Sequence, residues 1–316
     1  MGGNEISDEY DWLKKEIKRL VEIAEPVKEI YPKTFYHVGG WSLVKLLAFR
    51  RFVEIYTKII GAEKQKKFFK NMFYIDLMSG SGLCRVRKTK DIVAGSTIIA
   101  CVEAYHPFNK HFIVEQDPKK ASALEERVKH FTNDYKLFNC DCNDCIEEIL
   151  AQIPEKSHYL AFVDCLGMDV PWSTMKKIFS KNGDVLINFQ TSLLWRQPNI
   201  VKKQSRGWKK TKNNLNNFFG DSRWTEARES KDLLDAYIEK IKTETSRNLV
   251  ISLPVIGEGS YRYDIILATR LTKNGSPWIK SMQELEERMG GYKPAFIQSI
   301  LDYLMHRQTS VIDFCN

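Results

Sequence analysis

Small and acidic residues follow an apolar run near residue 75, in a pattern that suits ligand binding. The run 73–78 contains Asp76 and leads into a loop that contains Gly80 and Gly82. In open α/β sheets, ligands bind where loops leave the carboxyl ends of strands, and glycine lets the backbone approach them closely. We therefore predict that Asp76, Gly80 and Gly82 contribute to a cofactor site.

The same loop bears on the kind of cofactor. A Gly-x-Gly turn also occurs for packing reasons alone, so it does not identify a ligand by itself. A dinucleotide fingerprint would continue to a third glycine, whereas this chain has Arg85 at that position. The pattern disfavours NAD and FAD, and with them a nicotinamide oxidoreductase.

Acidic residues also follow the next two apolar runs. Glu115 ends the run 111–115, where a carboxylate can accept hydrogen bonds from both hydroxyls of a ribose. Asp141 and Cys142 follow the run 135–140, where a carboxylate can accept from the amine of adenine and a neighbouring N–H can donate to the ring. Helix capping by Asp141 is the structural alternative. Together these residues predict an adenosine ligand without a phosphate cradle, and such a ligand is S-adenosylmethionine.

A fourth apolar run, 159–164, ends in Asp164. Methyl transfer from a sulfonium cation is an in-line displacement, so positioning and electrostatics supply most of the catalytic effect. A carboxylate at this strand end could hold the acceptor group, and we predict that Asp164 is the catalytic residue. An aspartate that only caps a loop is the alternative.

The net charge of +8 is concentrated in one stretch. Between Asp184 and Asp221 there is no acidic residue, while seven cationic residues occur there: Arg196, Lys202, Lys203, Arg206, Lys209, Lys210 and Lys212. Trp195 and Trp208 are interleaved with them, and Phe218 and Phe219 follow. Cations neutralise phosphates and aromatic rings stack on unpaired bases. We predict that nucleic acid, DNA or RNA, binds this stretch, and we assign to it Trp195, Arg196, Lys202, Lys203, Arg206 and Trp208. A solvated basic loop whose aromatic rings pack on the sheet is the alternative.

The elements that would position these residues alternate between strands and helices. Five apolar runs from 73 to 189 are separated by helical segments, which predicts a mostly parallel sheet covered on both faces. Two later runs, 249–256 and 263–268, are close enough to form an antiparallel hairpin. We divide the chain into an N-terminal helical region (1–72), the first part of the α/β core (73–190), a basic and helical insertion (191–248), the hairpin (249–270) and C-terminal helices (271–316).

The motifs resemble those of class I S-adenosylmethionine-dependent methyltransferases, whose seven-stranded sheet ends in an antiparallel hairpin. The segments 74–82, 95–96, 162–172 and 184–189 together look like the three-Cys-motif partner protein family, which is methyltransferase-like. The resemblance implies a Rossmann-like fold, S-adenosylmethionine as cofactor and a possible protein partner.

Two departures from the family pattern affect the predicted site. Residues 83–95 intervene between the glycine loop and the next helix, and their cations, among them Arg85 and Arg87, could contact a polyanion. Cys165 stands where the family has proline. The missing proline supports a second hypothesis, a non-catalytic accessory protein that binds nucleic acid or a partner.

The remaining features limit where the protein acts. No apolar run reaches the ~18–20 residues that a membrane helix needs, and the N-terminus lacks the regions of a signal peptide. Seven cysteines argue against a disulfide framework, so we expect a reduced cytoplasmic protein. Cys140, Cys142 and Cys145 do not have the spacing of a paired Cys-x-x-Cys site, and we expect no metal.

Overall fold

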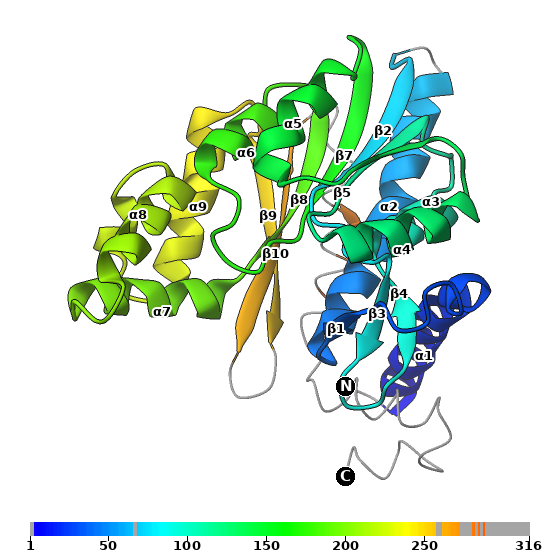
Figure 1. The fold of residues 1–316 in the computed structure, drawn as a ribbon, viewed down its shortest axis with the longest axis horizontal. Coiled ribbons are helices and arrows are strands. Elements are labelled where there is room, and N and C mark those ends of the chain that lie inside the picture. Colours follow the sequence, from blue (N-terminus) through cyan, green and yellow to red (C-terminus); the bar gives the residue numbers. More distant parts are fainter. Residues whose placement is uncertain are drawn as a thin grey trace.

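The computed structural model describes residues 3–65, 68–256 and 261–271, together with the single positions 280, 281, 284 and 287. Its centre is a seven-stranded sheet in the order β6-β5-β2-β7-β8-β10-β9 (Figure 1). The strands are β2 (Asn71–Asp76), β5 (Lys110–Val114), β6 (Tyr135–Phe138), β7 (Ser157–Val163), β8 (Gly183–Phe189), β9 (Leu249–Ile256) and β10 (Arg262–Thr269). The first five are parallel, and β10 pairs antiparallel with both β8 and β9. The predicted mostly parallel α/β sheet with a terminal hairpin is confirmed.

Helices cover both faces of this sheet because its central strands are apolar on both sides. In β2, Tyr74 packs into one hydrophobic core, while Phe73 and Ile75 pack into the other. The first core includes side chains of α1 (Gly3–Ala24), α2 (Trp41–Gln65), α3 (Ser96–Glu103) and α4 (Pro118–Lys129). The second includes side chains of α5 (Cys142–Ala151), α6 (Trp172–Ile178), α8 (Trp208–Phe219) and α9 (Ser230–Glu244). Short 3₁₀ turns follow α1 and α8, at Glu25–Val27 and Arg223–Glu226.

The segment 83–95, predicted as a loop, is a β-hairpin instead. Its strands β3 (Leu83–Val86) and β4 (Ile92–Ala94) pair antiparallel, and β1 (Tyr36–Val38) pairs parallel with β3. The hairpin forms because Leu83, Val86 and Val93 are buried against the N-terminal helices. A second, three-stranded sheet therefore lies beside the carboxyl ends of the main strands (Figure 1).

Gly61 lies within helix α2, although glycine is a common helix-stop signal. Helix α2 continues to Gln65, and a Cβ atom at position 61 would lie 2.2 Å from the ring of His106. The glycine is therefore a packing residue, which accommodates the imidazole against the helix. Residues 257–260 of the predicted hairpin lie outside the described residues. So do the predicted C-terminal helices (271–316), apart from residue 271 and four helical positions between 280 and 287.

Candidate active site

A cavity of about 690 Å³ lies at the carboxyl edge of the main sheet. Its walls come from the ends of β2, β5, β7 and β8, from the small sheet and from the first turns of α2. Of the predicted site residues, it is lined by Gly80, Gly82, Arg87, Glu115, Asp141, Cys142 and Asp164. The fold thus brings most of the predicted cofactor and catalytic residues to one cavity.

The glycine loop uses its two glycines for different purposes. Both have left-handed backbone conformations, with φ of 63° at Gly80 and 78° at Gly82. A Cβ atom at Gly82 would lie 3.0 Å from Leu124 and 3.3 Å from Ile98, so this glycine lets the loop pack on α3 and α4. At Gly80 the nearest side-chain atom would be 3.8 Å away, on Tyr36, which is an ordinary van der Waals distance. Gly80 therefore keeps the cavity wall free of a side chain.

Asp76 supports the glycine loop from behind and does not line the cavity. Its carboxylate is fully buried and accepts hydrogen bonds from the hydroxyls of Tyr74 (2.8 Å), Ser96 (2.7 Å) and Thr97 (2.9 Å). Burial raises the pKa of this carboxyl, and the three hydroxyl donors oppose that shift. The predicted cofactor contact of Asp76 is therefore corrected to a positioning role.

Glu115 and Asp141 retain acceptor capacity toward the cavity. Glu115 Oε1 accepts the backbone N–H of Asp117 at 2.8 Å. Asp141 is the N-cap of α5, and its Oδ1 accepts from the backbone N–H and the side-chain amide of Asn143 at 2.9 and 2.8 Å. Among the described residues, no donor occupies the second oxygen of either carboxylate. The two interpretations of Asp141, helix capping and ligand binding, are therefore compatible.

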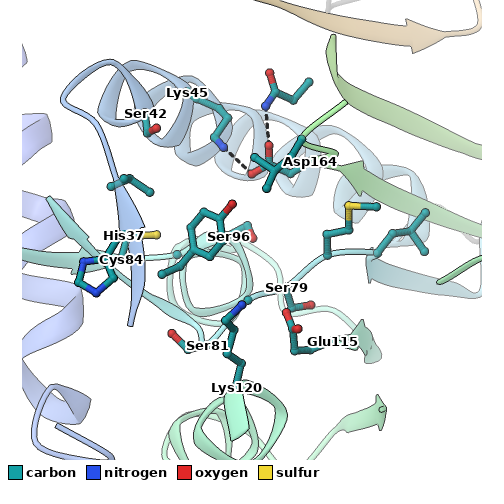
Figure 2. A pocket seen from close by; sticks show the side chains of 18 of the residues that line it. His37, Ser42, Lys45, Ser79, Ser81, Cys84, Ser96, Glu115, Lys120 and Asp164 are labelled. Atoms are coloured by element: carbon teal, nitrogen blue, oxygen red, sulfur yellow. Dashed lines mark hydrogen bonds and ion pairs between the residues drawn. The ribbon is translucent and has the colours of Figure 1, made fainter. Parts of the chain in front are cut away.

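Asp164 is held by two side chains from other elements (Figure 2). Its Oδ2 forms an ion pair with Lys45 of α2, and its Oδ1 accepts a 2.6 Å hydrogen bond from the amide of Asn188 in β8. The side chains of Lys45 and Asp164 are 11% and 20% exposed. The group is therefore largely shielded from water while its carboxylate still borders the cavity.

Sequence reasoning missed Lys45 and Tyr36. Lys45 occurs within an amphipathic helix, where a lysine usually points to solvent, and Tyr36 belongs to a strand of only three residues. Burial raises the pKa of Tyr36 to about 12, with smaller contributions from nearby charges that include Asp164. A local signal was the pair Gly39-Gly40, which directly precedes the helix and of which Gly39 lines the cavity.

The predicted substrate-binding residues divide into three groups. Arg87 lines the cavity, whereas Arg85 stacks on Phe35, with its guanidinium 4.5 Å from the ring centre. The seven cations of 196–212 lie on α7 (Thr191–Lys202), on α8 and between them, all exposed: Arg196, Lys202, Lys203, Arg206, Lys209, Lys210 and Lys212. Trp195 and Trp208 are half-buried, with Trp195 packed against the core.

Phe218 and Phe219 are not available to stack on the bases of a nucleic acid. Phe218 and Phe219 are fully buried at the C-terminal end of α8, among the side chains of the second core. Of the four aromatic residues at 195, 208, 218 and 219, the two tryptophans retain exposed surface. The stacking expected of the phenylalanines is therefore excluded by packing.

Three buried thiols near the site are not activated. Cys84 and Cys142 line the cavity, and Cys165 is buried beside it. Burial raises the pKa of all three thiols to about 12, so they remain protonated at neutral pH. The six cysteines in the described part of the chain form no disulfide, and no cluster of His, Cys, Asp or Glu there has the arrangement of a metal site.

Comparison with known proteins yields structural similarity only. The sequence matches no protein-family model and no curated protein. Solved structures with a similar fold include a protein from Legionella pneumophila (TM-score 0.44, 13% identity, covering 75% of this chain and 88% of that one). They also include a putative O-methyltransferase from Klebsiella pneumoniae (0.42, 10% identity, 81% and 90%) and the O-methyltransferase TomG from Streptomyces achromogenes in complex with SAM (0.38, 10% identity, 68% and 79%).

At this level of similarity the neighbours establish neither activity nor family membership. The resemblance to the three-Cys-motif partner family stays a prediction. Within the described residues, no helix combines the length and the apolar character needed to cross a membrane.

Proposed function

We propose that this protein is an S-adenosylmethionine-dependent methyltransferase and that nucleic acid is its acceptor. The observation that carries the proposal is the placement of Gly80, Glu115, Asp141 and Asp164 around one cavity. They follow β2, β5, β6 and β7 in turn, at the sheet edge where α/β folds bind ligands. The narrower resemblance, to three-Cys-motif partner proteins, is retained as part of this proposal.

The residues present fit this cofactor chemically. Glu115 and Asp141 each keep one carboxylate oxygen without a donor among the described residues, which suits the ribose hydroxyls and the adenine amine. Gly80, with its left-handed backbone, leaves room for close approach at the cavity wall. These features support an adenosine-containing ligand.

The chain's own residues would then orient the acceptor. The bound cofactor supplies an electrophilic methyl group on a sulfonium sulfur. Asp164 borders the same cavity, and its orientation is fixed by Asn188 and Lys45, so it can accept a hydrogen bond from an acceptor N–H or O–H group. Positioning of this kind supplies much of the rate enhancement in a displacement reaction.

Two observations support nucleic acid as the acceptor. The seven exposed cations of α7, α8 and the segment between them form no ion pair within the described part of the chain, so their charge is available to phosphates. Helix α7 begins directly after Gln190, which lines the cavity. Arg196 on this helix is near enough to Tyr261, another residue of the cavity wall, for its charge to lower the pKa of Tyr261, against the burial that raises it. The basic helices therefore extend from the cavity along one side of the sheet (Figure 1).

Isothermal titration calorimetry with S-adenosylmethionine and S-adenosylhomocysteine tests the cofactor assignment. We expect both ligands to bind and Glu115→Ala to weaken binding at least tenfold, because the ribose contact is lost. Glu126→Ala is the matched control, since Glu126 is an exposed acid that pairs with Lys129 on α4. If neither ligand binds to folded wild-type protein, the methyltransferase proposal is wrong and a non-catalytic adaptor is favoured.

Tritiated methyl transfer tests the acceptor class. Wild-type protein is incubated with methyl-labelled cofactor and either DNA or RNA, and the label in recovered nucleic acid is counted. We expect incorporation that Asp164→Ala reduces at least a hundredfold, because the acceptor is no longer oriented. Incorporation into neither polymer by protein that binds the cofactor would reject nucleic acid as the acceptor.

A further inference from the structure

The ion pair between Lys45 and Asp164 joins two parts of the fold at the cavity. Lys45 belongs to the second N-terminal helix, while Asp164 follows the fourth parallel strand of the main sheet. Figure 2 shows the lysine reaching from its helix toward the carboxylate, and both residues line the cavity. With Asn188 on the other oxygen, each carboxylate oxygen has one donor.

We propose that Lys45 is a positioning residue for Asp164: it fixes the carboxylate and cancels its charge, so that the acceptor side of the cavity is oriented but electrically neutral. The inference rests on the proposed function, because it concerns how the cavity treats a cationic cofactor. It adds a residue from outside the main sheet to the proposed site.

The physical reason lies in how charge changes during methyl transfer. The S–CH₃ bond breaks with its electron pair left on sulfur, while the acceptor forms the new bond, takes up the positive charge and then releases it as a proton. An uncompensated carboxylate that attracts the sulfonium would stabilise the starting state more than the transition state. The pair is largely shielded from water, so its electrostatic effect on a ligand in the cavity is only weakly screened. A neutral pair keeps Asp164 as a hydrogen-bond acceptor without this penalty.

Substrate and by-product provide a direct probe of the charge. S-adenosylmethionine and S-adenosylhomocysteine differ by one methyl group and one positive charge. The ratio of their dissociation constants therefore reports the electrostatic potential of the cavity, and it requires no acceptor. Loss of a merely structural contact would weaken both ligands together and leave the ratio unchanged.

Four variants test the charge of the pair: two single variants change it in opposite directions, and two others leave it neutral. Lys45→Met leaves Asp164 uncompensated, and we expect preference for the cationic ligand to rise about fivefold. Asp164→Asn leaves Lys45 uncompensated, and we expect that preference to fall about fivefold. The double variant is neutral again and Lys45→Arg keeps the pair, so both should remain within about twofold of wild type.

The matched control removes a lysine from the same helix. Lys58 pairs with Glu54 at 2.6 Å, is 47% exposed and does not line the cavity. Lys58→Met makes the same chemical change there, and we expect it to leave the ligand preference at the wild-type value. Thermal unfolding of every variant establishes that each is folded before titration.

The outcomes separate this inference from the proposed function. Shifts of opposite sign in the two single variants, with recovery in the double variant, support charge compensation by Lys45. If both ligands bind but the ratio does not change in either single variant, the inference is overturned while the cofactor assignment stands. If Lys45→Met does not fold, comparison of Asp164→Asn with the double variant decides, because recovery of the ratio in the double variant shows that the charge of Lys45 acts on the ligand, and no recovery overturns the inference. If neither ligand binds to wild-type protein, the proposed function fails and this inference fails with it.

Discussion

The hydroxyl of Ser96, in the first turn of α3, donates a 2.7 Å hydrogen bond to the buried carboxylate of Asp76 at the end of β2. Thr97 donates to the same oxygen at 2.9 Å. These bonds join the helix that follows the small hairpin to the strand that precedes the glycine loop. The 19 residues between Asp76 and Ser96 are thereby closed into one unit that borders the cavity.

Replacement of Asp76 tests this support. Asp76→Ala removes the acceptor for three buried hydroxyls, and each unsatisfied buried donor costs about 1–3 kcal/mol. We expect a fall of about 3 kcal/mol in the free energy of unfolding, measured by urea denaturation, whereas Ser96→Ala should cost about 1–2 kcal/mol. A loss below 1 kcal/mol in Asp76→Ala would show that the carboxylate is not a structural support.

The two loop glycines should respond differently to alanine. Gly82→Ala adds a methyl group 3.0 Å from Leu124 as well as left-handed strain, so we expect it to lower the free energy of unfolding by about 2–4 kcal/mol. Gly80→Ala makes an ordinary van der Waals contact with Tyr36 and no clash, so its left-handed strain alone should cost about 1–2 kcal/mol.

Ligand binding should separate the same two variants in the opposite sense. The methyl group in Gly80→Ala lies at the cavity wall. This variant should therefore lose more affinity for S-adenosylhomocysteine than Gly82→Ala does, although it loses less stability. Calorimetric titration and urea denaturation of both proteins measure the two effects. Equal effects on binding would contradict the separate roles assigned to the glycines.

The basic helices should contribute through charge. Lys209 and Lys210 are exposed on α8 and lack ion-pair partners in the described part of the chain. If both contact phosphates of a single strand, Lys209→Gln with Lys210→Gln should reduce the slope of log K against log salt by about 1.4, at about 0.7 per contact. Fluorescence anisotropy of a labelled single-stranded oligonucleotide over a salt series gives this slope.

A control pair on another helix makes the test specific. Lys15 and Lys18 are exposed on α1, which lies on the opposite side of the molecule from α8 (Figure 1). The corresponding double glutamine variant makes the same change in net charge. Equal loss of slope in the two double variants would reject α8 as the contact surface.

Local patterns predicted the sheet because each strand is a short apolar run with its own boundary signals. The glycine loop and the acids at residues 115, 141 and 164 could be placed at one edge, since parallel strands end together. Lys45 could not be placed, because its pairing with Asp164 depends on how α2 packs against the sheet. Gly61 shows the same limit of local patterns: glycine is a common helix-stop signal, but here the helix continues and the glycine packs against His106.

Asp184, a buried acid at the N-terminal end of β8, predicts that the stability of the protein depends on pH. Asp184 Oδ1 accepts a 2.6 Å hydrogen bond from Thr269, while its Oδ2 has no partner among the described residues. Burial raises the pKa of this carboxyl from 3.8 to about 6. The folded state therefore holds a proton that the unfolded state has lost between these pH values, and this group's stabilising contribution decreases as pH rises from about 4 to about 6.

Asp184→Asn removes this dependence while keeping an acceptor for Thr269. We expect the variant to gain stability relative to wild type by about 1–3 kcal/mol between pH 4 and pH 7, since one pKa unit corresponds to about 1.4 kcal/mol. Urea denaturation of both proteins at the two pH values measures it. Comparison with wild type cancels other titrations, such as that of His158, whose pKa burial lowers to about 3. A difference between the proteins that is the same at both pH values would mean that Asp184 is ionised in the folded state throughout this range.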